Sequence, residues 1–303
     1  MMNAIEFKNL TKTYRNQTVL NQIKFSIKEN VLTGVIGRNG VGKTTLMKIA
    51  AGHIKETSGS VTVFSEIPFN SLKVSANSIF VDDTMSFSEK LSLEEILFEA
   101  KRFFPNCDAT FAQRLVDYFG FHPRVRHKNL SKGKMNTFNA IIGIASRCPL
   151  TIFDEPTTGM DAVVRKDFYR ALLKDYIAHP RTILLSSHHL EEVEDLLEDI
   201  LLLNDGVIRF HGPITELQEM FVKVIGPEGH VRNHIAEKNV LDRQLNGSTY
   251  EALVVNEFTS DEKIRMYADG LKVISVPANE AYIALTSRVK GGIDDVFDRA
   301  TTV

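Results

Sequence analysis

Apolar and polar positions alternate in two stretches near the start of the chain, residues 4–8 and 19–27. This period of two is typical of half-buried antiparallel strands. Three later runs, 31–36, 150–153 and 182–185, are almost continuously apolar and predict buried strands. The pattern therefore predicts an antiparallel start followed by strands that lie inside a core.

Helical signals dominate the middle of the chain. Ser92 and Glu95 form a capping-box pattern at the start of a helix, in which each residue satisfies a backbone N–H near the other. A second helix is predicted over 109–119, where Gly120 takes the usual position just past the end, and a third ends before Pro149. We interpret this helical block, about 83–148, as a subdomain inserted into a β/α pattern.

The last third of the chain returns to mixed structure. After a predicted helix over 190–197, Asp205-Gly206 is a strong signal for a two-residue hairpin turn. From residue 221 the pattern predicts strands at 222–225, 252–255, 271–276 and 281–285 and helices near 233–244 and 260–268. We therefore divide the chain into a large domain, 1–220, and a small C-terminal α/β domain, 221–303.

Composition narrows the class of protein. With 303 residues and 43% hydrophobic content, the chain can build one large core and one small one. A net charge of −2 argues against a nucleic-acid-binding surface over the whole molecule. Cys107 and Cys148 show no metal-ligand spacing, which indicates a reduced, cytosolic protein. No apolar run approaches the ~18 residues of a membrane span, and the first residues lack signal-peptide features.

A glycine-rich loop between the strand at 31–36 and a predicted helix at 45–51 carries the main chemical signal. Residues 37–44 fit G-x-x-x-x-G-K-[ST], the phosphate-binding P-loop. Glycines let backbone N–H groups close around phosphate oxygens. Lys43 supplies a positive charge to the β- and γ-phosphates, and Thr44 supplies a hydroxyl ligand to Mg²⁺. A chance glycine-rich turn is the alternative, but the flanking strand and helix favour a nucleoside triphosphate site. The predicted ATP-binding residues of this loop are Gly37, Arg38, Asn39, Gly40, Val41, Gly42, Lys43, Thr44 and Thr45.

Polar side chains follow the two later buried strands. Asp154 and Glu155 end the first, and His188 ends the second. Ligands bind at the carboxyl ends of strands in open α/β sheets, so these groups are expected beside the phosphates. Capping of the next turn by the acids and a purely structural histidine are the plainer alternatives. Tyr14, ahead of the P-loop, either packs on a neighbouring strand or offers a ring on which adenine stacks.

These pieces, in this order, resemble the ATP-binding cassette (ABC) family of ATPases over roughly residues 3–220. The order runs from the aromatic residue through the P-loop, the helical insert, the Leu-Ser-x-Gly signature at 130–133, the Walker B strand and Gly159-Met160-Asp161 to the histidine. Residues 130–134 and 146–156 look more narrowly like Ytr-type bacterial exporter ATPases. The resemblance implies an α/β fold: a P-loop NTPase cassette with a RecA-like core, an antiparallel β subdomain and a helical subdomain, plus the small C-terminal domain.

The resemblance also implies roles for single residues on the hydrolytic side of the site. Lys43, Glu155 and His188 would be catalytic, with Glu155 as general base or orienter of the attacking water and His188 on the γ-phosphate. Asp154 would hold Mg²⁺ together with Thr44. Tyr14 would be the adenine-stacking ring. The implied cofactors are therefore ATP and Mg²⁺.

The signature residues would act on a different nucleotide. In this family they close over ATP bound to a second cassette, with a helix N-terminus aimed at its γ-phosphate. Asp161 would communicate between the two sites. The active form would thus be a homodimer or a heterodimer of cassettes. The signature residues here are Ser131, Lys132, Gly133 and Lys134.

Three residues depart from the family pattern. Lys132 and Lys134 stand where the signature usually has a glycine and a glutamine, and Asp83 stands where a glutamine is usual. Asp83 could still reach Mg²⁺ or its waters, but a carboxylate cannot donate an amide hydrogen bond. These departures bear on hydrolysis rate and on coupling to a membrane partner.

The resemblance implies an ATP-hydrolysing subunit of an ABC transporter, and we favour an exporter over an importer. It would work at the inner face of the cell membrane through a separate permease subunit, without nucleic acid. One rival is a soluble ATPase of the same superfamily that acts on ribosomes or DNA, but such members carry two cassettes or long coiled-coil inserts. The other rival is a regulatory ATPase whose C-terminal domain senses a ligand or partner.

Overall fold

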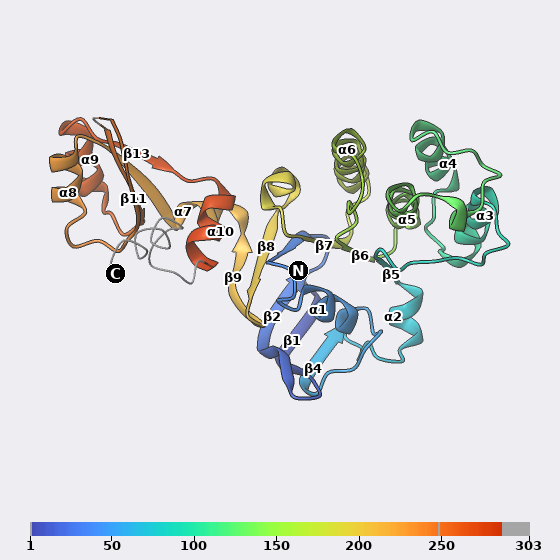
Figure 1. The fold of residues 1–303 in the computed structure, drawn as a ribbon. Helices are drawn as coiled ribbons and strands as arrows, with labels where there is room; N and C mark the ends of the chain where they lie inside the picture. Colours follow the sequence, from blue (N-terminus) through green and yellow to red (C-terminus); the bar gives the residue numbers. More distant parts are fainter. Residues whose placement is uncertain (1, 248, 287–303) are drawn as a thin grey trace, which may run out of the picture. The chain divides into compact units, whose positions relative to one another are not determined.

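The computed structural model describes residues 2–247 and 249–286 (Figure 1). The chain forms two compact units that divide between His211 and Gly212. The boundary predicted at residue 220 lies inside the second unit, after a short helix. We describe each unit by itself.

A six-stranded sheet forms the centre of the first unit, in the order β5-β6-β7-β3-β8-β9. The neighbours from β5 to β8 run parallel. Every position of β3, β6 and β7 is buried, which confirms the strands predicted from the three apolar runs. The predicted hairpin turn joins β8 to β9, and both of its residues, Asp205 and Gly206, have positive φ. The bounds are β3 Leu32–Ile36, β5 Ser78–Val81, β6 Leu150–Asp154, β7 Thr182–Ser187, β8 Asp199–Asn204 and β9 Val207–Pro213.

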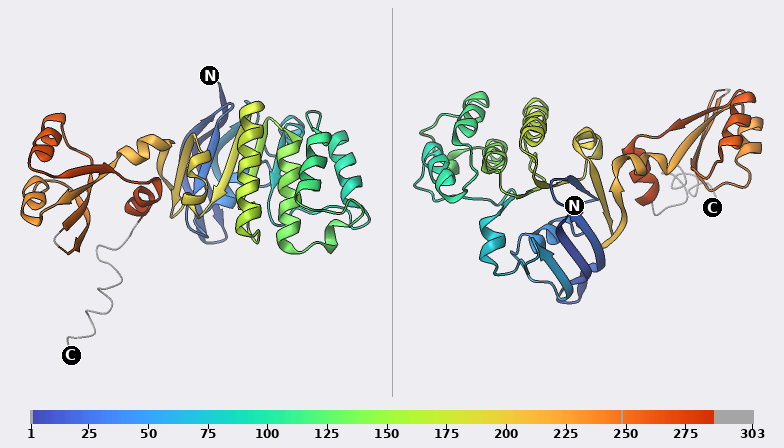
Figure 2. Two further views of the ribbon diagram at one scale, coloured as in Figure 1. Left: turned by 90° about the horizontal axis from the view of Figure 1, so that it is seen from above. Right: turned by 180° about the vertical axis from the view of Figure 1, so that it is seen from behind.

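A second, antiparallel sheet of three strands has the order β2-β1-β4, with β1 Asn3–Tyr14, β2 Gln17–Lys28 and β4 Ser58–Val63. Its inner face and helix α1, Lys43–Ala50, share one hydrophobic core with the large sheet. In Figures 1 and 2, α1 and this small sheet lie on one side of the large sheet, and α5 and α6 lie on the other. The predicted alternation at 4–8 and 19–27 thus matches two paired strands.

The helical insert follows β5 and lies beside it (Figure 1). Its main helices are α3, Leu93–Phe103, α4, Ala109–Tyr118, and α5, Lys132–Ser146, with the short α2, Leu72–Ala76, ahead of β5. The capping box at Ser92 and Glu95 is present, as predicted. After β6, helix α6 spans Ala162–Ala178, and a short 3₁₀ turn, His127–Asn129, precedes α5.

The helix predicted over 190–197 is instead two 3₁₀ turns, Leu190–Glu192 and Glu194–Leu196. Leu190, Val193, Leu196 and Leu197 are the buried apolar residues here. Their spacing fits an α-helix as well as a 3₁₀ helix, so the apolar pattern alone does not distinguish the two. The prediction of an α-helix was wrong.

The second unit is an antiparallel sheet in the order β11-β12-β10-β13, with helices packed on one face. Its strands are β10 Phe221–Gly226, β11 Val240–Asn246, β12 Thr249–Val255 and β13 Lys272–Ser275. Its helices are α7 Ile214–Glu219, α8 Glu228–His234, α9 Ser260–Ala268 and α10 Ala278–Thr286. The predicted α9 and three of the predicted strands are confirmed.

Two predictions in this unit were wrong. A helix was predicted near 233–244, but α8 ends at His234 and the residues from Val240 form the edge strand β11, paired with β12. Strand pairing outweighs the local helix propensity here. The strand predicted at 281–285 lies inside α10, where Ala278, Ala281 and Tyr282 are buried with helical spacing. A short apolar run alone does not distinguish these two states.

Candidate functional site

The glycine-rich loop joins β3 to α1 at the carboxyl edge of the large sheet. Gly42 has φ 110°, and a Cβ on Gly37 would lie 2.4 Å from the carbonyl oxygen of Leu203, so both positions require glycine. Lys43 is only 5% exposed and points back across the loop. Its ammonium group donates to the carbonyl of Gly37 at 2.6 Å. The loop is therefore preformed around this cation, while its tip at Arg38, Asn39 and Gly40 is exposed.

Asp154 ends β6 as a buried carboxylate beside the loop. The Ser186 hydroxyl donates to its Oδ1 at 2.7 Å. Burial raises the pKa of Asp154, and the hydrogen bonds from Thr44 and Ser186 act in the opposite direction. Thr44 and Asp154, which the sequence predicts to share a metal ion, are thus already in contact.

Glu155 stands at the meeting point of three elements. Its Oε1 pairs with the Lys43 ammonium at 3.2 Å, and its Oε2 contacts Nδ1 of His188 at 2.8 Å. Its own backbone has φ 48°, in the left-handed region that costs a non-glycine residue about 1–2 kcal/mol. Its backbone N–H donates to the Ser186 hydroxyl at 2.8 Å. The structure therefore brings together the P-loop lysine, the acids at the end of β6 and the histidine after β7.

The contacts of Ser186 went unpredicted in the sequence analysis. This residue is 1% exposed and lies directly opposite Asp154 in the parallel register of β6 and β7. The available signal was a serine near the end of a buried apolar strand, two residues before a histidine. Finding its partner requires the strand order, which places β7 beside β6.

The signature residues begin helix α5, with Ser131 as N-cap. A Cβ on Gly133 would lie 2.1 Å from the carbonyl oxygen of Gly159, so the first turn of α5 packs on the loop that follows β6. Asn136 reinforces the contact by donating to the carbonyl of Thr158 at 2.6 Å. Asp161 ends this loop and caps α6 by accepting from two backbone N–H groups. The signature helix and the loop with Asp161 therefore form one rigid contact.

Two of the three residues that depart from the family pattern, Lys132 and Asp83, are in contact. The Lys132 ammonium pairs with Asp83 at 2.9 Å, and both side chains are exposed. Asp82, by contrast, is nearly buried, pairs with Lys48 of α1 at 3.5 Å and accepts from Thr84. Asp83 thus faces the signature helix. Lys134 is exposed, and its ammonium group forms no ion pair within the part of the chain that the structure describes.

Tyr14 lies at the end of β1 and is 45% exposed. The Lys12 ammonium sits 4.8 Å from the centre of its ring. The ring is not packed into the core, so it is available to stack on a flat ligand.

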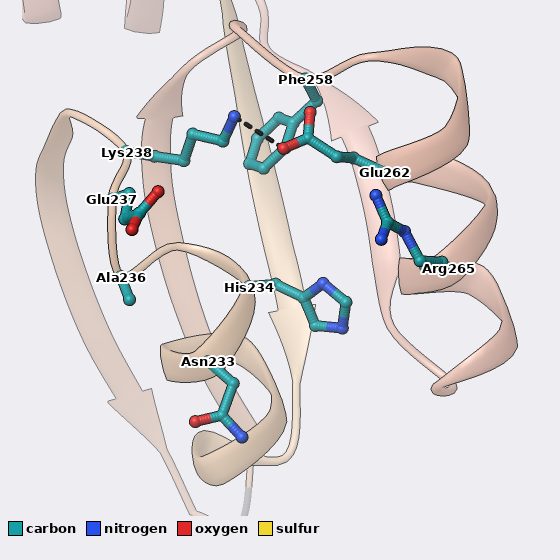
Figure 3. A pocket seen from close by; sticks show the side chains of 8 residues that line it. All are labelled: Asn233, His234, Ala236, Glu237, Lys238, Phe258, Glu262 and Arg265. Carbon is teal, nitrogen blue, oxygen red and sulfur yellow. Dashed lines mark ion pairs between the residues drawn. The ribbon is translucent and has the colours of Figure 1, made fainter.

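A cavity lies in the C-terminal unit, between α8, the chain that follows it and α9 (Figure 3). Its volume is about 320 Å³. Lys238 pairs with Glu262 across it at 2.9 Å, and the ring of Phe258 lies beneath that lysine. Backbone and lysine hydrogen bonds lower the pKa of Glu262 to about 2. The lining residues are Asn233, His234, Ala236, Glu237, Lys238, Phe258, Glu262 and Arg265.

Within residues 2–247 and 249–286, no cluster of histidine, cysteine and acidic side chains has the arrangement of a self-contained metal site. None of the helices in these ranges is long and apolar enough to cross a membrane.

The site and fold define a P-loop ATPase, and comparisons with known proteins narrow the class. A family model described as "ABC transporter" matches residues 20–158. The ABC transporter ATP-binding protein YtrB of Bacillus subtilis (strain 168) is 27% identical over 270 residues, which cover 88% of this chain and 91% of YtrB. The zinc uptake system ATP-binding protein ZurA of Listeria monocytogenes is 30% identical over 233 residues, covering 72% of this chain and 89% of ZurA.

A solved structure agrees on the fold. A dimeric ATP-binding cassette in a post-hydrolysis state, bound to ADP and Pi, superimposes with a TM-score of 0.61 at 19% identity, covering 69% of this chain and 98% of that one. The chain belongs to the ATP-binding proteins of the ABC transporter family. It is an ABC-type ATPase and the nucleotide-binding subunit of a transporter.

Proposed function

We propose that this chain hydrolyses ATP at a site shared with a second cassette and drives a separate permease, most simply as an exporter. The observation that carries the proposal is the chain of contacts from Lys43 through Glu155 to His188, beside the buried Asp154. A lysine, two acids and a histidine meet there at the carboxyl edge of the sheet. This edge is where a triphosphate binds in open α/β folds.

The residues around Asp154 suit Mg²⁺. Thr44 and Asp154 offer hydroxyl and carboxylate oxygens, the ligand types that a hard cation prefers. The carboxylate is buried, so a cation there would also compensate the cost of its desolvation. When bound, Mg²⁺ neutralises charge on the β- and γ-phosphates. Asp83 pairs with Lys132 at the start of α5, so we assign it to the signature helix rather than to the metal.

Glu155 is the group that acts on water. Its carboxylate is held between a lysine and a histidine, so its orientation is fixed before substrate binds. It would orient the attacking water and accept its proton, while His188 and Lys43 hold the γ-phosphate. The products are ADP and phosphate. The ring of Tyr14 would stack on adenine.

A second cassette would complete the site. Helix α5 begins at the N-cap Ser131, and its first turn carries Lys132 and Lys134 and no acidic residue, so the helix dipole and Lys134 make this end positive although Lys132 is paired with Asp83. This end suits the γ-phosphate of ATP held by another chain. The dimeric cassette with a similar fold supports this arrangement. Asp161, on the loop packed against α5, would pass movement between the two sites.

The catalytic assignment is tested with Glu155→Gln. We expect ATP binding to be unchanged and turnover to fall by about 10²- to 10⁴-fold, because the amide cannot accept a proton. The variant should also accumulate an ATP-bound dimer in size-exclusion chromatography. Glu66→Gln, which changes an exposed acid paired with Lys73, is the matched control. Turnover of Glu155→Gln equal to that of the control would exclude Glu155 as the catalytic carboxylate.

The binding assignment is tested with Lys43→Ala. This variant removes the buried cation of the P-loop, so we expect much weaker binding of a fluorescent ATP analogue. Lys73→Ala, at an exposed ion pair, should bind the analogue normally. Normal binding by Lys43→Ala would contradict the P-loop assignment.

Coupling and direction need the membrane protein. ATPase activity is measured for the chain alone and with the permease encoded beside it, reconstituted in vesicles. Stimulation by the permease, with substrate moving away from the nucleotide side, is the expected result. Uptake toward the nucleotide side, as the name of ZurA would suggest, would contradict export but not the ATPase assignment.

A second candidate function is regulation by a ligand of the C-terminal unit, and the cavity in Figure 3 favours it. Arg265 and Glu237 line this cavity and form no ion pair within residues 2–247 and 249–286. A thermal-shift screen of small zwitterions and anions on the full chain tests this function. A shift that Arg265→Gln abolishes, together with a change in ATPase rate, would establish it.

A further inference from the structure

Ser186 connects the two acids at the end of β6, Asp154 and Glu155. Its hydroxyl has one proton, which it donates to Oδ1 of Asp154 at 2.7 Å. A lone pair of the same oxygen accepts the backbone N–H of Glu155 at 2.8 Å. The residue is 1% exposed, so water cannot replace either bond without entering the core. Both functions of this hydroxyl are therefore in use.

We propose that Ser186 is a positioning residue that sets the catalytic carboxylate of Glu155 and the metal-binding carboxylate of Asp154 in one fixed geometry. The inference rests on the proposed function of these two acids. It adds a residue that touches neither nucleotide nor water and acts through both acids.

The backbone of Glu155 is the reason that a positioning residue is needed. With φ 48°, this residue lies in the left-handed region, which is unfavourable for a residue with a Cβ. The hydrogen bond to Ser186 offsets part of that cost, because it holds the backbone N–H of Glu155 in place. Without it, the backbone at Glu155 gains freedom to leave the left-handed region. The carboxylate would then turn away from His188 and Lys43.

The parallel register of the sheet explains why residue 186 can do this. Asp154 and Ser186 are directly paired between β6 and β7, so their side chains project from the same face. Strand β7 continues to His188, which contacts Glu155. One strand therefore holds Glu155 twice, by its backbone through Ser186 and by its side chain through His188.

The test compares Ser186→Ala with Ser186→Thr, which keeps the hydroxyl. For Ser186→Ala we expect single-turnover hydrolysis about 10- to 100-fold slower, the range for supporting residues of metal sites. We also expect a clear rise in the Mg²⁺ concentration needed for half-maximal rate. Binding of a fluorescent ATP analogue without Mg²⁺ should stay unchanged, because the P-loop is intact. Ser186→Thr should recover most of both losses.

The matched control is Thr33→Val, on the neighbouring strand β3. Thr33 is also fully buried, and its hydroxyl has no hydrogen-bond partner among the described residues. Removing that hydroxyl should leave rate and Mg²⁺ dependence unchanged. The proposal is overturned if Ser186→Ala keeps the wild-type rate and Mg²⁺ dependence, or if Thr33→Val or Ser186→Thr loses as much as Ser186→Ala. Such a result, with Glu155→Gln inactive, would leave the proposed function standing; an active Glu155→Gln would remove the function itself.

Discussion

The buried acid Asp175 on α6 joins the helical insert to the large sheet, and its removal is expected to destabilise the first unit strongly. Its side chain is 1% exposed and pairs with Arg181 at 2.9 Å and with Arg147 at 2.8 Å. Arg181 precedes β7, and Arg147 ends α5. Asp175→Asn keeps the shape of the side chain and removes its charge.

The size of the effect follows from the burial of the two arginines. Arg181 is 4% exposed, so its charge would lose a partner inside the core, and breaking such a buried pair costs about 3–5 kcal/mol. Arg147 is 18% exposed and also pairs with Asp108 at 3.2 Å, so it adds little. The remaining amide oxygen can still accept one hydrogen bond. We therefore expect a loss of about 3 kcal/mol.

The measurement is urea unfolding followed by hydrogen exchange of peptides from β6 and β7. This readout reports the first unit alone, since a chain with two compact units need not unfold in one step. The control is Asp167→Asn on the same helix, where the partners Tyr118 and Arg170 are exposed and a loss of about 0–1 kcal/mol is expected. Adding Arg181→Met to Asp175→Asn should recover part of the loss.

Equal losses for Asp175→Asn and Asp167→Asn would refute this reasoning. Such a result would mean that the charge of Arg181 is solvated in spite of its burial. A double variant less stable than Asp175→Asn would mean that packing by the arginine stem, rather than its charge, decides the stability.

Two further outcomes are expected from close packing. Gly133→Ala would force the backbones at Gly133 and Gly159 apart, costing about 1–3 kcal/mol and slowing turnover, whereas Gly229→Ala, with open space around it, should change neither unfolding nor ATPase rate. Burial raises the pKa of the Cys148 thiol to about 11, so at pH 8 mass spectrometry should find no alkylation of Cys148 in the folded protein. The half-buried Cys107 should react slowly, and both thiols should react in urea; rapid alkylation of folded Cys148 would contradict its burial.

The nucleotide loop could be predicted from the sequence because all of its parts lie close together in the chain. A buried strand, a glycine-rich loop and a helix follow one another within about 20 residues, and each has a short-range signal. The same holds for the capping box at Ser92 and the hairpin turn at Asp205. At 190–197 and 281–285 the apolar spacing was ambiguous, and local signals predicted the wrong element. Tertiary packing decides there between an α-helix and a 3₁₀ turn, or between a helix and a strand.

The sequence already carries the groups that we propose for the chemistry: a cation at Lys43, carboxylates at Asp154 and Glu155, and an imidazole at His188. Their meeting depends on the order of the strands. Strand β7 lies between β6 and β3, and this order places Ser186 opposite Asp154 although 32 residues separate them. Strand order is set by long-range burial of apolar faces, which no short stretch encodes. The chemical groups can therefore be recognised from short stretches of the chain, whereas their relative positions depend on the strand order of the sheet.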